Sequence, residues 1–239
     1  MLLLLAACTA PTHDSGDTGT PANPPVNQVA TRFEVADEDE AFDLDGDGAP
    51  DNAIADLAGA IDSLVAERLA TNVHVVVVQL ADVNRWAEDP AIQVGLFPAV
   101  DADSDGSDNA SGAEVFDATG FLDAEGRALE PGSAAIEGGR YTTNVPTSTF
   151  QVGSFVFDVA TGVYVTGTPT AGGQTGVAGI GVTTEALTHA LTQEGVDEAI
   201  ITLLTDRADL DLDRDGVVES VSMAFTFEAT TCQLEIVGP

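Results

Sequence analysis

The sequence predicts an α+β fold that is mainly antiparallel β-sheet, sandwich-like, with a few peripheral helices. Short apolar segments with the alternating pattern typical of strands outnumber the segments with a helical repeat. Of the 239 residues, 44% are hydrophobic and 20% are charged, which is the composition of a folded chain and not of a disordered one. One compact domain, residues 29–239, is the simplest interpretation of this pattern.

The first half of this domain is expected to contain three strands and one helix. Residues 29–36 alternate as a strand, and residues 52–70 carry apolar side chains at helical spacing. Residues 73–80 form a continuous apolar run suited to a buried strand. His74 lies within this run, so we expect a core histidine and not a metal ligand. Residues 92–100 are expected to form a further strand.

The second half is predicted to be richer in strands. Residues 114–129 contain many turn signals. Three segments that follow are predicted to form an antiparallel meander: residues 151–159, 163–168 and 174–183. The glycines of the third segment lack the frame of a phosphate-binding loop, which favours tight turns and closely packed strands instead.

Two short helices, residues 184–193 and 196–205, are then expected to be separated by Gly195 as a helix-terminating residue. Residues 217–227 alternate as the closing strand.

Three acidic segments share the pattern D-x-D-x-D-G, which can turn alternate side chains onto one hard cation. In such a loop, positions 1, 3, 5 and 9 offer side-chain oxygens, position 7 offers a backbone carbonyl, and the glycine at position 6 allows the sharp turn. The predicted Ca²⁺ ligands are Asp43, Asp45, Asp47, Ala49 and Asp51 in the first loop; Asp101, Asp103, Asp105 and Asn109 in the middle loop; and Asp211, Asp213, Asp215, Val217 and Glu219 in the last loop.

The middle loop is the weakest match because Asn109 at its ninth position is neutral. The alternative for all three segments is a solvated acidic loop with no metal. The loops are also incomplete as EF-hands, since position 12 holds Ile54, Gly112 and Ser222 in place of glutamate.

These segments resemble the isolated calcium loops of the dockerin and thrombospondin type 3 families. The resemblance covers the loops alone, so it implies a calcium ion and no activity. A dockerin has two loop–helix units close together, and therefore cohesin binding is not implied.

The charge distribution excludes one class of partner and favours clustered metal loops. The formal net charge is −33, from 40 acidic and 7 basic residues, and every basic residue is arginine. Such a chain repels nucleic acid. A halophilic surface would also be acidic, but the acids gather in residues 37–51 and 206–219, whereas residues 145–184 contain only Asp158.

The beginning of the chain predicts a cellular location. Leu5-Ala6-Ala7-Cys8 resembles the lipobox of bacterial lipoproteins, which implies that residues 1–8 are a signal remnant and that Cys8 is lipidated. An ordinary trimmed signal peptide is the alternative. Residues 9–28 are rich in Ser, Thr, Gly and Pro and are expected to be a flexible tether. The expected location is the cell envelope, with the lipid anchored in the outer membrane on its periplasmic or surface face.

The order of lipobox, tether, calcium loop, β-rich region and calcium loop resembles uncharacterised lipoproteins of the myxobacterial type, a resemblance that implies no activity. With Cys8 acylated, Cys232 has no disulfide partner and is expected to be a small core residue. The alternative is an oxidised Cys8–Cys232 pair in an exported protein, which would require the tether to fold back.

The sequence contains no strong catalytic signature. There is no G-x-S-x-G segment, and His13, His74 and His189 lack the local spacing of a zinc site. Only a convergence of carboxylates could supply hydrolysis, the candidates being Glu114, Glu137 and Asp158.

We therefore expect a calcium-binding, lipid-anchored envelope protein that is a structural or binding module, with a sheet face that meets a polysaccharide or another envelope protein. Trp86, Tyr141 and Tyr164 are the candidate sugar-contacting aromatics. The alternatives are a calcium-dependent extracellular hydrolase acting on polysaccharide or another polymer, and a structural lipoprotein with no ligand beyond calcium.

Overall fold

The computed structural model describes residues 23–71, 74–109, 111–159, 161–212 and 214–235. Ten strands form one large sheet in the order β12-β4-β3-β2-β1-β11-β10-β9-β6, with β5 paired to β3. All pairs are antiparallel except β12–β4. The strands are β1 Val26–Val35, β2 His74–Ala81, β3 Asp89–Asp101, β4 Val115–Asp117, β5 Gly132–Ile136, β6 Tyr141–Val145, β9 Val163–Thr170, β10 Gly173–Thr183, β11 Ser220–Thr231 and β12 Gln233–Glu235.

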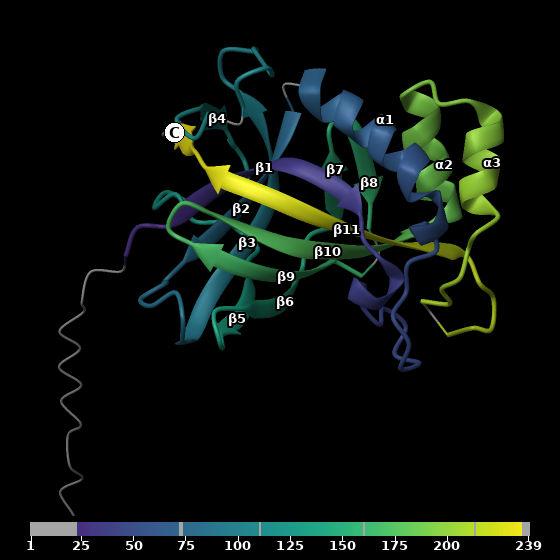
Figure 1. Ribbon diagram of the computed structural model, residues 1–239, viewed down its shortest axis with the longest axis horizontal. Coiled ribbons are helices and arrows are strands. Elements are labelled where there is room, and N and C mark those ends of the chain that lie inside the picture. The colour runs from purple at the N-terminus through teal and green to yellow at the C-terminus, as the bar shows by residue number, and fades with distance from the viewer. Residues whose placement is uncertain (1–22, 72–73, 110, 160, 213, 236–239) are drawn as a thin grey trace, which may run out of the picture.

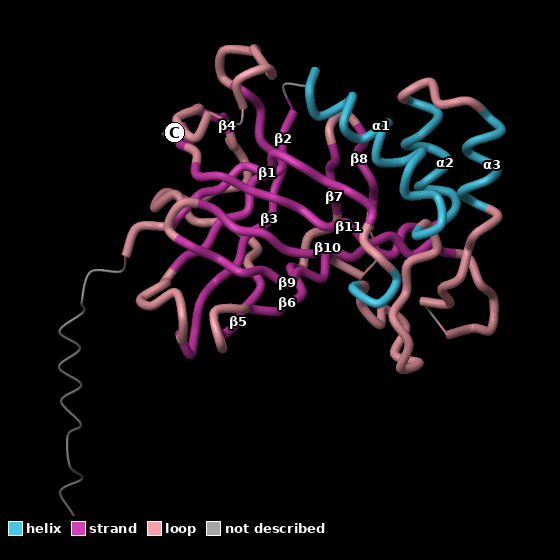
Figure 2. The backbone as a smooth tube through the Cα atoms, viewed as in Figure 1, coloured by secondary structure: helices cyan, strands magenta, loops and turns pink. Residues whose placement is uncertain are grey.

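This sheet curls into a half-barrel, and its concave side is covered by a small hairpin and three helices (Figure 1). The tube in Figure 2 shows that the helices gather at one end of the molecule. The hairpin strands are β7 Thr149–Val152 and β8 Phe155–Asp158, and the three helices are α1 Ala58–Thr71, α2 Thr184–Gln193 and α3 Glu198–Thr205. Two 3₁₀ helices, η1 Glu38–Glu40 and η2 Ala55–Leu57, lie between β1 and α1 in the chain. The fold is therefore mainly antiparallel β with peripheral helices, as the sequence predicts.

The main core lies between the concave face of the sheet and this cover. Phe33 of β1 lies at its centre, with ring centroids 6.0 Å from Phe150, 6.4 Å from Phe225 and 6.2 Å from Phe227. Small aliphatic side chains, chiefly Val, Ile, Leu and Ala, surround these rings. The core therefore depends on many branched side chains packed around one aromatic cluster, in keeping with an aromatic content of only 5%.

The predicted helix at 52–70 begins later than its pattern suggests. Asn52 is buried, its amide donates to the carbonyl of Ala36 at 2.7 Å, and its Oδ1 accepts from the backbone of Ala224 at 3.1 Å. This residue therefore ties the first acidic loop to β1 and β11 before the chain enters η2 and α1. The spacing of apolar residues predicts the helix, but it does not show that Asn52 bonds to Ala36 and Ala224.

Two expectations for individual segments are wrong. Residues 151–159 are not one strand: Gly153, with φ +57°, turns the chain between β7 and β8, and this hairpin packs against the core instead of joining a meander. A two-residue turn preserves the alternation of side chains, so one strand and a tight hairpin look alike in sequence. His74 is exposed at the first position of β2 and is not a core histidine.

Strand boundaries differ in other places as well. Strand β1 begins at Val26, inside the segment expected to be a tether, and β3 extends to Asp101, the first residue of the middle acidic loop. Strands β5 and β6, which the sequence did not predict, are joined at Gly138 and Gly139, both with positive φ. The two short helices and the Gly195 turn, with φ +68°, agree with the prediction.

The glycine-rich strand β10 makes room for two acidic loops on the convex face of the sheet. Ile180 and Val182 of this strand point into the core, so the alternating residues Gly179 and Gly181 face outward. A Cβ on Gly179 would lie 2.5 Å from the Phe42 ring, which belongs to the first loop. A Cβ on Gly181 would lie 3.1 Å from Leu210, which leads into the last loop.

Substitution of Gly179 tests this packing. Gly179→Ala is expected to lower the free energy of unfolding by about 1–3 kcal/mol, because the added methyl displaces Phe42 and with it the first loop. Gly59→Ala in α1 is the matched control: its Cβ would meet nothing within 4 Å, and stability should be unchanged or raised by up to about 1 kcal/mol. Urea denaturation measures both, and equal stability of Gly179→Ala and the parent protein would contradict the packing argument.

Candidate metal-binding loops

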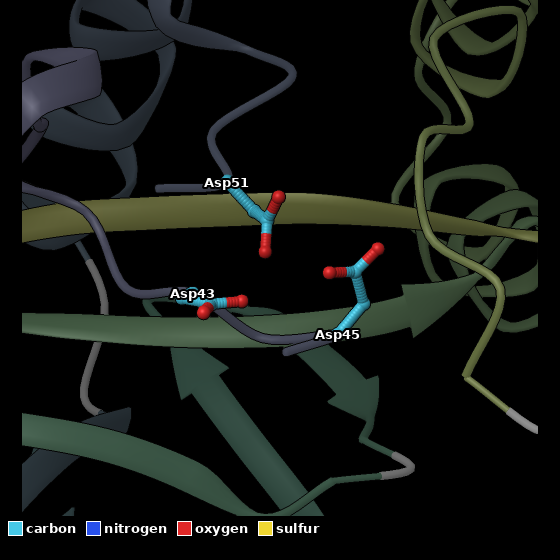
Figure 3. A group of neighbouring side chains, drawn as sticks. All are labelled: Asp43, Asp45 and Asp51. Atoms are coloured by element: carbon cyan, nitrogen blue, oxygen red, sulfur yellow. The ribbon is translucent and has the colours of Figure 1, made fainter. Parts of the chain in front are cut away.

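Each of the three acidic loops gathers three carboxyl groups that could hold a metal ion. Within each group, one oxygen from every residue lies within 4.8 Å of the others. The groups are Asp43, Asp45 and Asp51 in the first loop; Asp101, Asp103 and Asp108 in the middle loop; and Asp211, Asp215 and Glu219 in the last loop. Figure 3 shows the first group, with its side chains directed toward a common space.

Backbone hydrogen bonds close the first loop around its carboxylates. The amide of Asp51 donates to the carbonyl of Phe42 at 2.8 Å, which brings the two ends of the loop together. The Asp43 carboxylate accepts from the amides of Gly46 at 2.7 Å and Gly48 at 3.0 Å. Both glycines have positive φ, a conformation in which a side chain would be strained. The D-x-D-x-D-G sequence therefore folds locally as its pattern indicates.

The last loop repeats this arrangement. Its Asp211 carboxylate accepts from the amides of Asp215 at 3.1 Å and Gly216 at 2.8 Å. The loop closes where Leu210 pairs with Ser220, immediately after Glu219. The Oε2 atom of Glu219 is buried and has no hydrogen-bond partner within the described residues.

The first and last loops lie side by side. The guanidinium of Arg214 in the last loop donates to the backbone carbonyl of Asp45 at 3.1 Å. Loss of hydration raises the pKa of Asp51, and repulsion from Asp45 and Asp209 adds to this effect. Loss of hydration also raises the pKa of Asp209, although hydrogen bonds from Ser222 oppose the shift. Negative charge is thus crowded at the contact between the two loops.

The middle loop contains the most buried carboxylate of the three groups. Asp101, the last residue of β3, is only 2% exposed. Its Oδ1 accepts from the amide of Asp103 at 3.2 Å, whereas its Oδ2 is buried and has no hydrogen-bond partner within the described residues. Burial raises the pKa of Asp101, and the nearby carboxylates of Asp103 and Asp108 raise it further. A cation beside Oδ2 would satisfy this oxygen.

Several predicted ligands take other roles or are not placed. The Asp47 carboxylate accepts from the amide of Ala49, and that of Asp105 accepts from Ser107, so neither joins a carboxylate group. Asn109 is buried within the middle loop but does not belong to its carboxylate group. Asp213 lies outside the described residues, as do Cys8 and the rest of the lipobox.

Two residues near the loops were missed by the sequence analysis. Asp108 takes part in the middle group, where Asn109 was expected. The sequence could have indicated Asp108 as a ligand, because it is the only acid that follows Gly106 within the loop. Asp209 was overlooked because it precedes the D-x-D-x-D-G frame and comes near the first loop only through the tertiary fold.

Other candidate functional residues are separated or covered. Glu114, Glu137 and Asp158 belong to none of the three carboxylate groups. Tyr141 is fully buried beneath the sheet surface and donates to Gln174 Oε1 at 2.8 Å, so it is not available to a sugar. Burial raises the pKa of its phenol.

The remaining two aromatics are only partly covered. Trp86 packs against the main core, and the half-buried Tyr164 faces Phe42, with ring centroids 5.8 Å apart. Within the described residues Cys232 has no disulfide partner; it packs against a second, smaller core cluster, and burial raises the pKa of its thiol to about 12. The thiol is therefore protonated at neutral pH.

Comparisons with known proteins return no relative. No family model, no curated protein and no solved structure matches the chain. In the described part of the chain, no helix has the length and apolarity needed to cross a bilayer.

The raised pKa of Asp101 has a defined consequence for stability. A carboxyl group whose pKa is higher in the folded state than in the unfolded state binds its proton more tightly when folded. Its contribution favours folding at low pH and is lost as the pH rises from the unfolded pKa through the folded pKa. At neutral pH, the ionised Asp101 therefore destabilises the fold unless a cation compensates its charge.

Asp101→Asn tests this argument at neutral pH. In EGTA the variant is expected to exceed the parent protein in unfolding free energy by on the order of 1 kcal/mol, because a buried uncompensated charge is removed. The variant should also lose the stabilisation that calcium gives through the middle loop. Asp103→Asn, at an exposed position of the same group, is the control and should leave the calcium-free stability almost unchanged. A variant that is less stable in EGTA and responds normally to calcium would contradict the argument.

Proposed function

We propose that this protein is a calcium-binding, lipid-anchored module of the bacterial cell envelope with a structural or binding role. The observation that carries the proposal is the closure of three D-x-D-x-D-G segments into carboxylate groups, one of which contains the buried, unpartnered Oδ2 of Asp101. Burying a carboxylate oxygen without a hydrogen-bond donor costs free energy, so a solvated acidic loop with no metal is not expected to do so.

Calcium fits these groups better than other common metals. The gathered side chains are all carboxylates, with no histidine or cysteine, and hard oxygen ligands favour Ca²⁺ or Mg²⁺ over zinc and copper. Carboxylates can bind through one or two oxygens, which suits the six to eight oxygen ligands of calcium more than the strict octahedron of magnesium. The missing twelfth-position glutamate predicts moderate affinity, as in extracellular calcium modules.

The role of the ion would be to hold the loops on the fold. The first and last loops cross the convex face of β10 and contact each other through Arg214 and Asp45. Their carboxylates repel one another by about 1 kcal/mol at 4 Å even in bulk water, and by more near a protein surface. A bound cation converts this repulsion into an attraction that links β1, α1, α3 and β11.

Thermal unfolding in calcium and in EGTA at matched ionic strength tests the proposal. Calcium at about 100 times its Kd should add about 2.7 kcal/mol of stability for each occupied site. The midpoint should therefore rise well beyond the effect of an equal concentration of magnesium. Equal midpoints in calcium and EGTA would contradict calcium binding and favour a halophilic surface instead.

The lipid anchor is supported by the sequence Leu5-Ala6-Ala7-Cys8 and by the polar segment that separates it from β1. When the chain is produced in a bacterium behind a complete lipoprotein signal sequence, we expect cleavage before Cys8 and acylation of that residue. Intact-mass analysis would show two or three added acyl chains, and Cys8→Ser would abolish both the mass increase and membrane association. An unmodified Cys8, or cleavage elsewhere, would refute the anchor.

A further inference from the structure

A shallow polar groove crosses the convex face of the sheet next to the first acidic loop. It has a volume of about 310 Å³, at the small end of ligand sites, and it spans strands β1, β11, β10 and β9. Figure 1 shows these strands side by side, with β6 beyond β9. The polar side chains that line the groove include Arg32, Glu40, Arg140, Thr168, Thr175 and Glu228. Thr166 and Thr226 also line it, but their hydroxyls donate to the backbone carbonyls of Tyr141 and Glu34.

Strand register aligns five of these side chains in one row. Thr168 pairs with Thr175, Thr175 with Glu228, and Glu228 with Arg32. Arg140 immediately precedes Tyr141, the partner of Gly167, which places it next to Thr168 in the same row. With strands about 4.8 Å apart, four strand spacings extend this row over roughly 19 Å.

Most of these groups keep hydrogen-bonding capacity. Within the described residues, the hydroxyls of Thr168 and Thr175 have no hydrogen-bond partner, and the guanidinium of Arg140 has neither a hydrogen bond nor an ion pair. Arg32, in contrast, is held by Glu34 at 2.5 Å and Glu228 at 2.6 Å. The guanidinium of Arg140 therefore offers five donors to the groove.

The charges of the groove indicate a neutral ligand. Arg32 and Arg140 balance Glu40 and Glu228, so the groove itself carries no net charge. The formal charge of the whole chain, −33, disfavours an anion at short range. A row of donors, hydroxyls and one carboxylate matches a ligand that offers both hydroxyl donors and oxygen acceptors along its length.

We propose that this groove binds a neutral oligosaccharide chain laid across strands β6, β9, β10, β11 and β1. Sugar hydroxyls both donate and accept, so they can bond to Arg140, to the two threonine hydroxyls and to Glu228 in turn. The threonine methyl groups offer small apolar contacts to the sugar ring. This inference rests on the proposed calcium-stabilised binding role, and Glu40 at the groove lies three residues before Asp43 of the first loop.

Titration of the calcium-loaded protein with neutral hexasaccharides tests the inference. Cellohexaose, maltohexaose and xylohexaose are the probes, hexagalacturonate is the acidic comparison, and calorimetry with NMR detection reports binding. We expect saturable binding of at least one neutral probe. Arg140→Ala should weaken it by about tenfold or more, since charged hydrogen bonds are lost. The double variant Thr168→Val with Thr175→Val should also weaken it while keeping the branched shape of both side chains.

Arg85→Ala is the matched control, because Arg85 is exposed, lies outside the groove and its guanidinium has no partner within the described residues. Its affinity should equal that of the parent protein. No binding of any neutral probe, binding that Arg140→Ala leaves unchanged, or binding of the acidic probe alone would overturn the inference. If the same sample shows calcium stabilisation, the calcium proposal survives that failure. Neutral-sugar binding without any response to calcium would instead support the groove and refute the calcium proposal.

Discussion

The convex face of strand β10 sets the positions of both acidic loops at the ends of the domain. Gly179 admits Phe42 from the first loop, and Gly181 admits Leu210 before the last loop. A side chain at Gly179 would displace the Phe42 ring, and one at Gly181 would press on Leu210, so both glycines favour the observed approach of the loops, in which Arg214 contacts the carbonyl of Asp45. A packing constraint on one strand therefore creates an electrostatic problem, because it places two acid-rich loops next to each other.

Besides Arg32, three of the seven arginines form ion pairs within the described residues that do not involve the loop carboxylates. Arg68 pairs with Glu194, Arg127 with Asp82 and Arg207 with Asp56, and these pairs join helices or loops that are distant in sequence. Seven arginines cannot neutralise 40 acids, so the loop carboxylates are left to gather without cationic side chains. Calcium in three loops would supply six positive charges beside these carboxylates.

Much of the fold follows from local patterns. The helices around Gly195 are predictable because a glycine with positive φ ends the first helix and the apolar face of each is regular. The buried strand β2 is predictable because a continuous run of valines is typical of a strand that is covered on both faces. The β7–β8 hairpin is not, because the turn at Gly153 leaves the alternation of side chains undisturbed.

The candidate sites likewise depend partly on local sequence spacing, which is predictable, and partly on the tertiary fold, which is not. Spacing alone identifies the three loops, since Asp43 and Asp211 bind the amides of their own loops. The burial of Asp101 depends on β3 running directly into the middle loop, and the contact of the outer loops depends on β10. The row from Arg140 to Arg32 depends on the register of five strands, which an individual strand sequence does not encode.

A crystal structure of the calcium-loaded protein, with an anomalous difference map, tests the central claim most directly. The account predicts three anomalous peaks, one in each carboxylate group, with oxygen ligands at about 2.3–2.6 Å. The peak in the middle loop should contact Asp101 Oδ2, and the peaks in the outer loops should lie on either side of Arg214. A map with well-ordered loops and no peak at any of the three groups would contradict the account.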